Sequence, residues 1–442
     1  MPLALAIFGV LFLIAAFGPV RWSIVAYLLL STIDFSQSSE SIGMLNTAKG
    51  IILPLYLLWR LRAYGGHRKI ILAPIAWSLL VVYVAIAGFW SVFPIAAVKL
   101  IGHMTGSLLI CFVLMRATKA GLLKMRLAVP VAIGALALGI VCSAWQPHWA
   151  GNEGRFSSFC TAQAYASFLA ALYCIVLCSR TLPMYVRIAT AATLAAALVA
   201  NGSRIWTIGI VIATFVALFV SEVRPCVKIW GGGLTIVLVA VVLGSAEAAI
   251  AVLAPYAESN RIAAAIIAAY EGDTRSDGLG TYRFRRGADA KELAGIEESS
   301  PLQLLFGHGT SNGSLLVVGN RIKRGMDPNR LMHNEWLRVM YEWGILGAVL
   351  WLMFIGSIAV YALDGLKSES GDYAKPLVAY LPAFLVGLAG ENILAGAGSS
   401  ASVGFLLIVA LASVSHRQFT SPIFRRVAAA EPLMVPLFAS RT

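Results

Sequence analysis

Apolar stretches long enough to cross a membrane recur along almost the whole chain, and they constrain its fold more than any other feature. A helix needs about 20 apolar residues to span a bilayer. Such stretches lie near 44–61, 70–90, 96–116, 126–144, 161–179, 184–200, 204–221, 228–254, 334–362, 376–395 and 400–415. Only 12% of the residues are charged, against about 25% in soluble domains. The sequence therefore predicts an all-α fold, a polytopic transmembrane helical bundle.

The basic residues gather in short connections, mainly 60–69 and 116–126, and in the C-terminal tail. Short basic connections stay in the cytoplasm, so the net charge of +13 indicates topology and not nucleic-acid binding. The apolar N-terminus lacks a basic start and a small-residue cleavage site, which predicts a retained span. If 3–36 crosses once, broken at Gly18-Pro-Val-Arg, about twelve spans result with both ends inside. A hairpin there is the alternative, with thirteen spans and an outer N-terminus.

These patterns divide the chain into four parts. We expect an N-terminal transmembrane bundle of about nine spans over 1–254, a large helical loop over 255–333, three C-terminal spans over 334–415 and a basic cytoplasmic tail over 416–442. Loops as long as 255–333 are uncommon unless they are functional or disordered. This loop contains apolar segments, so we expect a folded cap on the outer face of the bundle. The six cysteines have neither zinc-site nor disulfide spacing, which predicts no metal and no cofactor.

The span 334–362 begins with ionisable residues. If its helix starts near Met332, then His333, Gly344 and Gly347 share one face, on which the glycines let a neighbouring helix approach closely. A helix N-terminus disfavours imidazolium, so His333 would be neutral and could accept a proton from a hydroxyl group. The alternative is a histidine that is only hydrogen-bonded at an interface.

Three charged residues follow His333 at helical spacing. Glu335, Arg338 and Glu342 are three and four residues apart, so they can form ion pairs with one another. This mutual pairing accounts for their place at the start of an apolar span.

Arginines supply the candidate anion sites. Arg204 lies in the first turn of a span, where a cation is unfavourable unless an anion binds at the helix N-terminus. The alternative is an arginine that reaches toward lipid phosphates. Arg283, Arg285 and Arg286 crowd one turn of the loop, and arginine suits bidentate contact with phosphate. For Arg285 and Arg286 we favour a solvated helix face, because Asp289 and Glu292 lie within helical reach of some of these arginines.

Weaker candidates lie at the same outer face. They are Arg155 in Gly-Arg-Phe-Ser-Ser, Lys99 and His103 at the start of span 96–116, and Glu391 near the outer end of a late span. An ionisable residue in a span is a functional candidate by default.

Several motifs resemble those of the bacterial O-antigen ligases. His333-Asn334, nine residues and Gly344-x-x-Gly347 match their pattern of His-Asn/Ser/Gln, nine residues and Gly-x-x-Gly. Gly-Ser-Arg204 is similar to their first arginine motif. Thr-Tyr-Arg283, some twenty residues before Phe-Gly-His-Gly, is similar to the second, which lies in their large periplasmic loop. Gly-Arg155-Phe-Ser-Ser resembles a stretch of the wider family of ligases and O-antigen polymerases. Relatives often have an aromatic residue about a turn after the second arginine, whereas this chain has Arg-Phe-Arg-Arg-Gly.

The resemblance implies a GT-C-like glycosyltransferase of the bacterial inner membrane whose active site faces the periplasm. It would transfer a glycan from undecaprenyl diphosphate to lipid A–core oligosaccharide, with inversion and without metal, in lipopolysaccharide biosynthesis. The implied catalytic residues are His333, Arg204 and Arg283. The candidate substrate contacts are Arg155, Asn334, Lys99, His103, Arg285, Arg286 and Glu391.

Three other functions remain open at this point. An O-antigen or related polysaccharide polymerase would use the same donor with a lipid-linked glycan as acceptor. An oligosaccharyltransferase of the same superfamily would modify protein. A transporter or flippase for an anionic lipid-linked glycan is the non-enzymatic alternative, and it is disfavoured because the ionisable residues gather at one face and not at the midplane.

Overall fold

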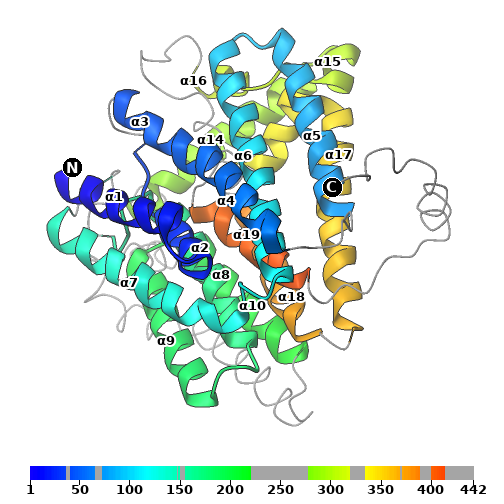
Figure 1. Cartoon of the computed structure of the whole chain (residues 1–442). Coiled ribbons are helices and arrows are strands. Elements are labelled where there is room, and N and C mark those ends of the chain that lie inside the picture. Colours follow the sequence, from blue (N-terminus) through cyan, green and yellow to red (C-terminus); the bar gives the residue numbers. More distant parts are fainter. Residues whose placement is uncertain are drawn as a thin grey trace, which may run out of the picture.

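A computed structural model describes residues 1–35, 40–64, 72–146, 148–149, 155–220, 277–318, 334–368, 371–388 and 400–413 of the chain (Figure 1). Within these ranges every regular element is a helix. Four helices are long and apolar enough to cross a membrane: Pro94–Lys119, Met125–Trp145, Met184–Asn201 and Glu335–Leu366. The chain is thus helical and of the membrane-embedded type. The predicted span 228–254 and the tail 416–442 lie outside the described residues.

The helices follow the predicted apolar stretches closely. In chain order they are α1 (Pro2–Phe17), α2 (Val20–Leu30), α3 (Glu40–Thr47), the π-helical η1 (Ala48–Ile52), α4 (Leu53–Leu61), η2 (Arg62–Tyr64), α5 (Leu72–Ala87), η3 (Gly88–Trp90), α6 (Pro94–Lys119), η4 (Met125–Leu127), α7 (Ala128–Trp145), α8 (Ala162–Cys178), α9 (Met184–Asn201), α10 (Arg204–Val220), α14 (Asp277–Glu297), α15 (Pro301–Phe306), α16 (Ser314–Val318), α17 (Glu335–Leu366), η9 (Gly371–Tyr373), α18 (Lys375–Leu388) and α19 (Ser400–Ala412). Apolar length alone predicted most of these boundaries to within a few residues.

The first two helices fold back on each other. Phe8 of α1 packs edge-on against Phe35, just after α2, with ring centroids 5.3 Å apart. Two collinear helices would hold these rings about 40 Å apart at a rise of 1.5 Å per residue. The chain reverses at Gly18, whose backbone is extended, and Pro19 cannot donate a helical hydrogen bond. Residues 3–35 therefore have the backbone shape of the hairpin alternative, whereas the number of times that this segment crosses the membrane stays a prediction.

Basic side chains tie helix ends together at one end of the bundle. Arg60 donates from its guanidinium to the carbonyls of Ala16 and Gly18, both at 2.8 Å. Arg116 donates to the carbonyls of Leu61 and Arg62 at the end of α4. Carbonyls at helix C-termini have no partner within the helix, and cations satisfy them well. These arginines therefore have a structural role besides the topological role that the sequence predicts.

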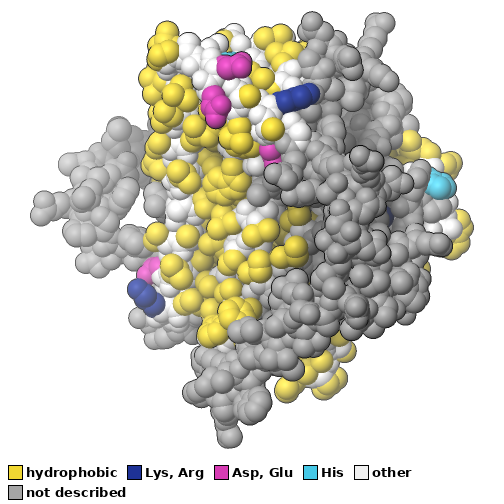
Figure 2. All heavy atoms as spheres, turned by 180° about the vertical axis from the view of Figure 1, so that it is seen from behind, with side chains coloured by type: hydrophobic (Ala, Val, Ile, Leu, Met, Phe, Trp, Pro, Cys, Tyr) yellow, Lys and Arg dark blue, Asp and Glu magenta, His cyan; other side chains and the backbone are white. Residues whose placement is uncertain are grey.

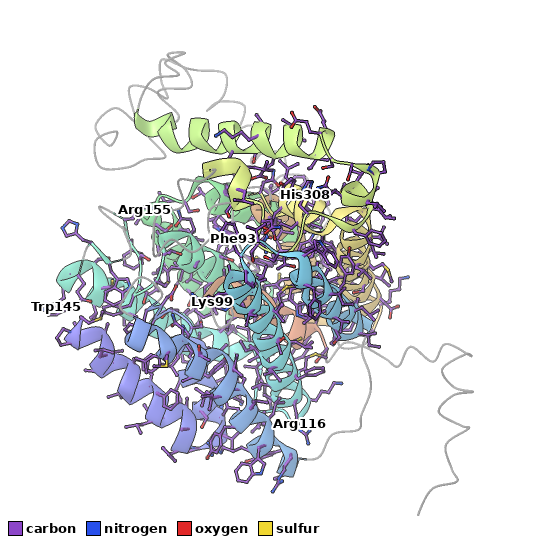
Figure 3. All side chains as sticks on the ribbon, turned by 90° about the horizontal axis from the view of Figure 1, so that it is seen from above. Phe93, Lys99, Arg116, Trp145, Arg155 and His308 are labelled. Atoms are coloured by element: carbon purple, nitrogen blue, oxygen red, sulfur yellow. The ribbon has the colours of Figure 1, made fainter. Side chains whose placement is uncertain are left out.

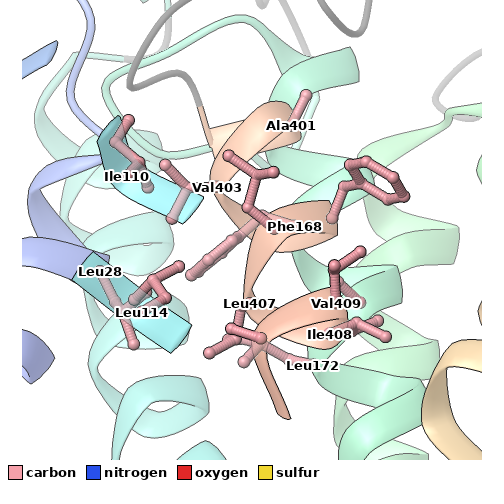
Figure 4. Close-up of a cluster of buried hydrophobic side chains, with 14 of the residues drawn as sticks. Leu28, Ile110, Leu114, Phe168, Leu172, Ala401, Val403, Leu407, Ile408 and Val409 are labelled. Atoms are coloured by element: carbon pink, nitrogen blue, oxygen red, sulfur yellow. The ribbon is translucent and has the colours of Figure 1, made fainter. Parts of the chain in front are cut away.

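Helix α19 lies in the centre of the bundle, where its apolar side chains meet those of α2, α6 and α8 (Figure 4). Gly404 permits a close approach, since a Cβ built there would lie 3.1 Å from the Cα of Phe168. Phe405 stacks on Phe384 of α18, with centroids 4.0 Å apart. A helix that is apolar on every side is stable only when other helices surround it.

The outside of the bundle is also apolar, and Figure 2 shows hydrophobic side chains over one face with charged ones near its upper and lower parts.

One ion pair fixes the relative direction of two important helices. The guanidinium Nε of Arg180, just after α8, lies 3.4 Å from a carboxylate oxygen of Asp372, which follows α17. The C-terminal ends of α8 and α17 therefore lie at one end of the bundle. Their N-terminal ends, with Arg155 before α8 and Asn334 before α17, lie at the opposite end, which we call the outer end.

Candidate functional site

Helix α17 begins at a side-chain cap. The side-chain oxygen of Asn334 accepts hydrogen bonds from the amides of Trp336 (3.1 Å) and Leu337 (3.3 Å). Asparagine is a favoured N-cap, since it satisfies amides that have no helical partner. The helix thus starts at Glu335, and the predicted start near Met332 is wrong. His333 precedes the cap and lies outside the described residues, so its predicted place on the face of Gly344 and Gly347 no longer follows.

The three charged residues of the first turns pair as their spacing predicted. A guanidinium nitrogen of Arg338 lies 3.4 Å from Glu335, and its Nε lies 3.6 Å from Glu342. All three side chains are buried, with at most 2% of each residue exposed. A buried ion pair is costly to break, because removal of one partner leaves the other charge unpaired. The group is therefore an internal element of the outer end and not a solvated interface.

Helix α17 is kinked at Gly344, which adopts φ 63° and ψ −165°. The kink leaves two carbonyls of the helix free for the loop 307–313. The amide of His308 donates to the carbonyl of Tyr341 at 2.9 Å, and the amide of Gly309 donates to the backbone carbonyl of Glu342 at 3.0 Å. Close approach requires glycine on both sides, since a Cβ on Gly344 would lie 2.5 Å from the amide nitrogen of Gly307. Gly344 thus admits a loop and not the helix that its spacing predicted.

The second glycine of the motif behaves as expected. A Cβ on Gly347 would lie 2.2 Å from the Cβ of Trp343, next to the kink, and 3.2 Å from the ring of Tyr83 on α5, so this glycine accommodates the kink as well as close packing between α5 and α17. The hydroxyl of Tyr83 also lies 3.0 Å from the carbonyls of both Phe306 and Trp343. One tyrosine thus joins α5, the end of α15 and the kink.

The carboxylate of Glu342 holds the other half of the loop. It accepts hydrogen bonds from the amides of Ser311 (2.9 Å) and Gly313 (3.1 Å). Ser311 has a left-handed backbone with φ 70°, which is uncommon for a residue with a side chain. Successive amides around such a residue form a small anion-binding concavity. The loop is thus built around a buried protein carboxylate.

Gly344→Ala should destabilise the protein strongly. The alanine would need a backbone conformation that only glycine adopts readily, and its Cβ would meet the backbone of Gly307. We expect a loss of about 3 kcal/mol, measured as thermal unfolding of the detergent-purified protein. Gly356→Ala on the same helix is the matched control, because a Cβ there meets nothing within 4 Å. Equal stability of the two variants would contradict the role of Gly344.

Helix α14 covers the start of α17 and packs on α16 (Figures 1 and 3). Its docking face consists of Ala288, Glu292 and Gly295, spaced four and three residues apart, and continues to Ser299. A Cβ on Gly295 would lie 2.8 Å from Leu316 of α16.

The Ser299 hydroxyl lies 2.7 Å from Nε2 of His308, whose ring stacks on Tyr341 with ring centroids 4.1 Å apart. Burial lowers the pKa of His308, so this imidazole is neutral at pH 7 and serves as a packing group.

Glu292 is the exceptional member of this face. It is completely buried, and neither of its carboxyl oxygens has a hydrogen-bond partner in the part of the chain that the structure describes. Burial raises its pKa to about 8, with further contributions from the carboxylates of Asp289 and Glu342. Arg338 acts in the opposite direction. Glu292 is therefore mostly protonated at pH 7.

A second group at the outer end joins two motifs that are far apart in sequence. The Nε of Arg155 donates to the carbonyl of Asn201, the last residue of α9, at 2.8 Å. The side-chain amide of Asn201 donates in turn to the carbonyl of Phe156 at 2.7 Å. Gly202 then turns the chain in a left-handed conformation, φ 71°, into α10, whose first residue is Arg204. The segments Gly-Arg-Phe-Ser-Ser and Asn-Gly-Ser-Arg thus form one unit.

The other candidates are scattered or not described. Lys99 is exposed on α6 and His103 is half-buried one turn later (Lys99, Arg155 and His308 are labelled in Figure 3). The backbones of Arg204 and of the α14 arginines (Arg283, Arg285 and Arg286) are described, but their side chains are not. His333 and Glu391 lie outside the described residues.

Sequence reasoning missed two features of the outer end. Glu292 was considered only as a partner for nearby arginines, and the segment 307–313 only as the end of an apolar stretch. A local signal existed for the loop, since glycines at 307, 309 and 313 mark a backbone with unusual turns. No comparable signal marks Glu292, because its burial depends on packing between helices that are distant in sequence.

The described residues contain an apolar recess but no metal-binding group. No set of three or more His, Cys, Asp or Glu side chains in them could hold a metal ion. Between α5, α6, α17 and α19 lies a small recess with a cavity volume of about 20 Å³, lined by Trp77, Leu108, Phe354, Phe405 and Val409, among others. Ser107, also in its wall, stands 13 residues into α6, which places the recess about 20 Å from the outer end.

No model of a protein family matches the chain, and no curated protein matches it.

Proposed function

We propose that the protein is an O-antigen ligase, a GT-C-like glycosyltransferase that joins a glycan from undecaprenyl diphosphate to lipid A–core oligosaccharide. The proposal places it in the bacterial inner membrane with the outer end toward the periplasm. One observation carries most weight besides the motif resemblance: Arg155 and the turn that leads into Arg204 form one unit at the end of the bundle where α17 also begins. The segments that contain Arg155 and Arg204 thus lie at the end of the bundle where α17 begins.

The chemistry of such a transfer suits the residues at this end. The acceptor hydroxyl oxygen attacks the anomeric carbon while the bond from that carbon to the diphosphate oxygen breaks, with inversion. In the proposal His333 takes the hydroxyl proton, and the diphosphate leaves with both electrons of the broken bond. Arg204 and Arg283 stabilise the charge that develops on the diphosphate. Arg155 helps to order the turn before Arg204, because a cation is favourable at the C-terminus of α9.

The apolar parts of the molecule are compatible with a lipid-linked donor. Large hydrophobic side chains are exposed on the outside of the helices, and burial of hydrocarbon against such a surface is favourable by about 0.8 kcal/mol per methylene group. In the proposal the polyprenyl chain lies against this apolar outside of the bundle while the diphosphate stays at the outer end.

The direct test is reconstitution. The purified protein in lipid nanodiscs is given an undecaprenyl-diphosphate-linked glycan together with lipid A–core oligosaccharide. We expect glycan-bearing lipopolysaccharide and free undecaprenyl diphosphate. If the glycan grows only on a second lipid-linked glycan, the protein is a polymerase. Movement of the donor across a bilayer without any new glycosidic bond would identify a transporter and overturn the proposal.

Transfer should not depend on a divalent cation. In the proposed reaction the arginines neutralise the diphosphate, which a metal ion does in many other glycosyltransferases. EDTA added to the reconstituted assay should leave the initial rate unchanged. A loss of rate that magnesium or manganese restores would show that the arginines do not suffice.

A further inference from the structure

The docking face of α14 combines small residues with one trapped carboxyl group. Ala288 and Gly295 bring the helix so close to its neighbours that a Cβ on Gly295 would lie 3.2 Å from the ring of Tyr341. Glu292 lies between them, fully buried. A buried polar group without a hydrogen bond is costly, and the cost is much greater when the group is charged. The docked position of α14 therefore depends on the ionisation state of Glu292.

The charges around Glu292 favour its neutral form. On its own helix the nearest charged group is Asp289, and on α17 the groups are Glu335, Arg338 and Glu342. Helix α16 carries no titratable residue, and the loop 307–313 contributes only His308, which is neutral at pH 7. Arg338 already pairs with both glutamates of α17. Among the described side chains, ionisation of Glu292 would thus add a negative charge that no further cation compensates.

We propose that protonation of Glu292 controls the docking of α14. Helix α14 stays docked on the start of α17 while the Glu292 carboxyl group is protonated, and it is released when that group ionises; we call this proton-controlled contact the latch. The latch is independent of sugar transfer, because it needs only the packing of α14 on α16 and α17.

The direction of the pH dependence follows from linkage. Burial raises the pKa of docked Glu292 from about 4.5 to about 8, whereas the undocked side chain regains the ordinary value in water. The docked state therefore binds the proton more tightly. Docking is strongest below about pH 4.5, weakens by at most about tenfold per pH unit as the pH rises toward 8, and is constant above that.

Hydrogen exchange of the α14 amides tests the latch. Exchange of 288–297 is measured by mass spectrometry on the full-length protein in nanodiscs between pH 6 and pH 8, for the wild type and Glu292→Gln. The ratio of their protection factors at each pH cancels the intrinsic exchange rate. We expect wild-type protection to fall relative to the variant by nearly tenfold per pH unit below pH 7 and less steeply near pH 8, or about fiftyfold in total.

Two further variants make the test specific. Glu292→Met fills a similar volume without an ionisable group, so its protection should show no such fall even if the buried amide of Glu292→Gln weakens docking. Glu297→Gln removes an exposed carboxylate from the same helix, and it should keep the wild-type slope. Wild-type protection that does not change between pH 6 and pH 8 would overturn the latch, and so would the wild-type slope in Glu292→Gln or Glu292→Met.

Activity provides a readout that separates the latch from the proposed function. If transfer needs α14 in its docked position, the wild-type rate of transfer should fall toward pH 8 more steeply than the rate of Glu292→Met. If wild-type protection falls with pH but the transfer rates of the wild type and Glu292→Met change in parallel, then transfer does not need docked α14, and the latch itself still stands.

Discussion

His333→Ala should abolish glycan transfer without loss of folding. In the proposed reaction this imidazole takes the proton of the acceptor hydroxyl, and general bases contribute about 10²- to 10⁴-fold to a rate. We expect the initial rate in the reconstituted assay to fall at least a hundredfold. Folding should be normal because the hydrogen bonds that start α17 come from Asn334. The thermal unfolding midpoint in detergent is the measure of folding.

Two variants sharpen this test. His333→Gln retains hydrogen-bonding capacity but cannot accept a proton at neutral pH, so it should be as inactive as the alanine variant if His333 is a base. Activity close to wild type in His333→Gln would reduce the residue to a hydrogen-bonding role. His148→Ala removes an exposed histidine at another position on the chain and should transfer normally. Near-normal transfer by His333→Ala itself would exclude the general-base role.

The local features of this protein could be predicted because their causes are local. A span must be apolar over a bilayer's thickness, so the apolar stretches predicted the helix boundaries. The ion pairs of Arg338 with Glu335 and Glu342 follow from helical spacing alone. The N-cap at Asn334 was missed, although asparagine is favoured at this position, because the sequence analysis placed the start of the helix near Met332.

The long-range features could not be predicted from the same patterns. The loop 307–313 meets α17 because Gly344 kinks that helix and frees two carbonyls, and spacing along a sequence does not reveal a kink of this kind. Burial of Glu292 runs against the usual exposure of glutamate. The hairpin of α1 and α2 depends on contacts such as that between Phe8 and Phe35, which apolar length does not specify.

Two arginines should be far more sensitive than their neighbours to replacement by lysine. Diphosphate is best bound through paired, planar donors, which the single ammonium group of lysine cannot supply. In the proposal Arg204 and Arg283 make these contacts. A charge-assisted hydrogen bond is worth about 1.5–3 kcal/mol. We therefore expect Arg204→Lys and Arg283→Lys each to lose about ten- to a hundredfold in the rate of transfer, with unchanged folding.

The neighbouring arginines of α14 supply the matched controls, because spacing on the helix separates them from Arg283. Residues two apart on a helix do not face the same side, so Arg283 and Arg285 cannot both contact one diphosphate. Asp289 follows Arg285 by four residues and Arg286 by three, whereas Arg283 has no acidic residue three or four positions away. An intrahelical carboxylate can thus satisfy Arg285 and Arg286 but not Arg283.

Arg285→Lys and Arg286→Lys should keep most of the activity. Equal losses at all three positions would mean that α14 attracts the donor only by bulk charge, and a loss at Arg285 alone would assign the diphosphate to the face of α14 that docks on the bundle.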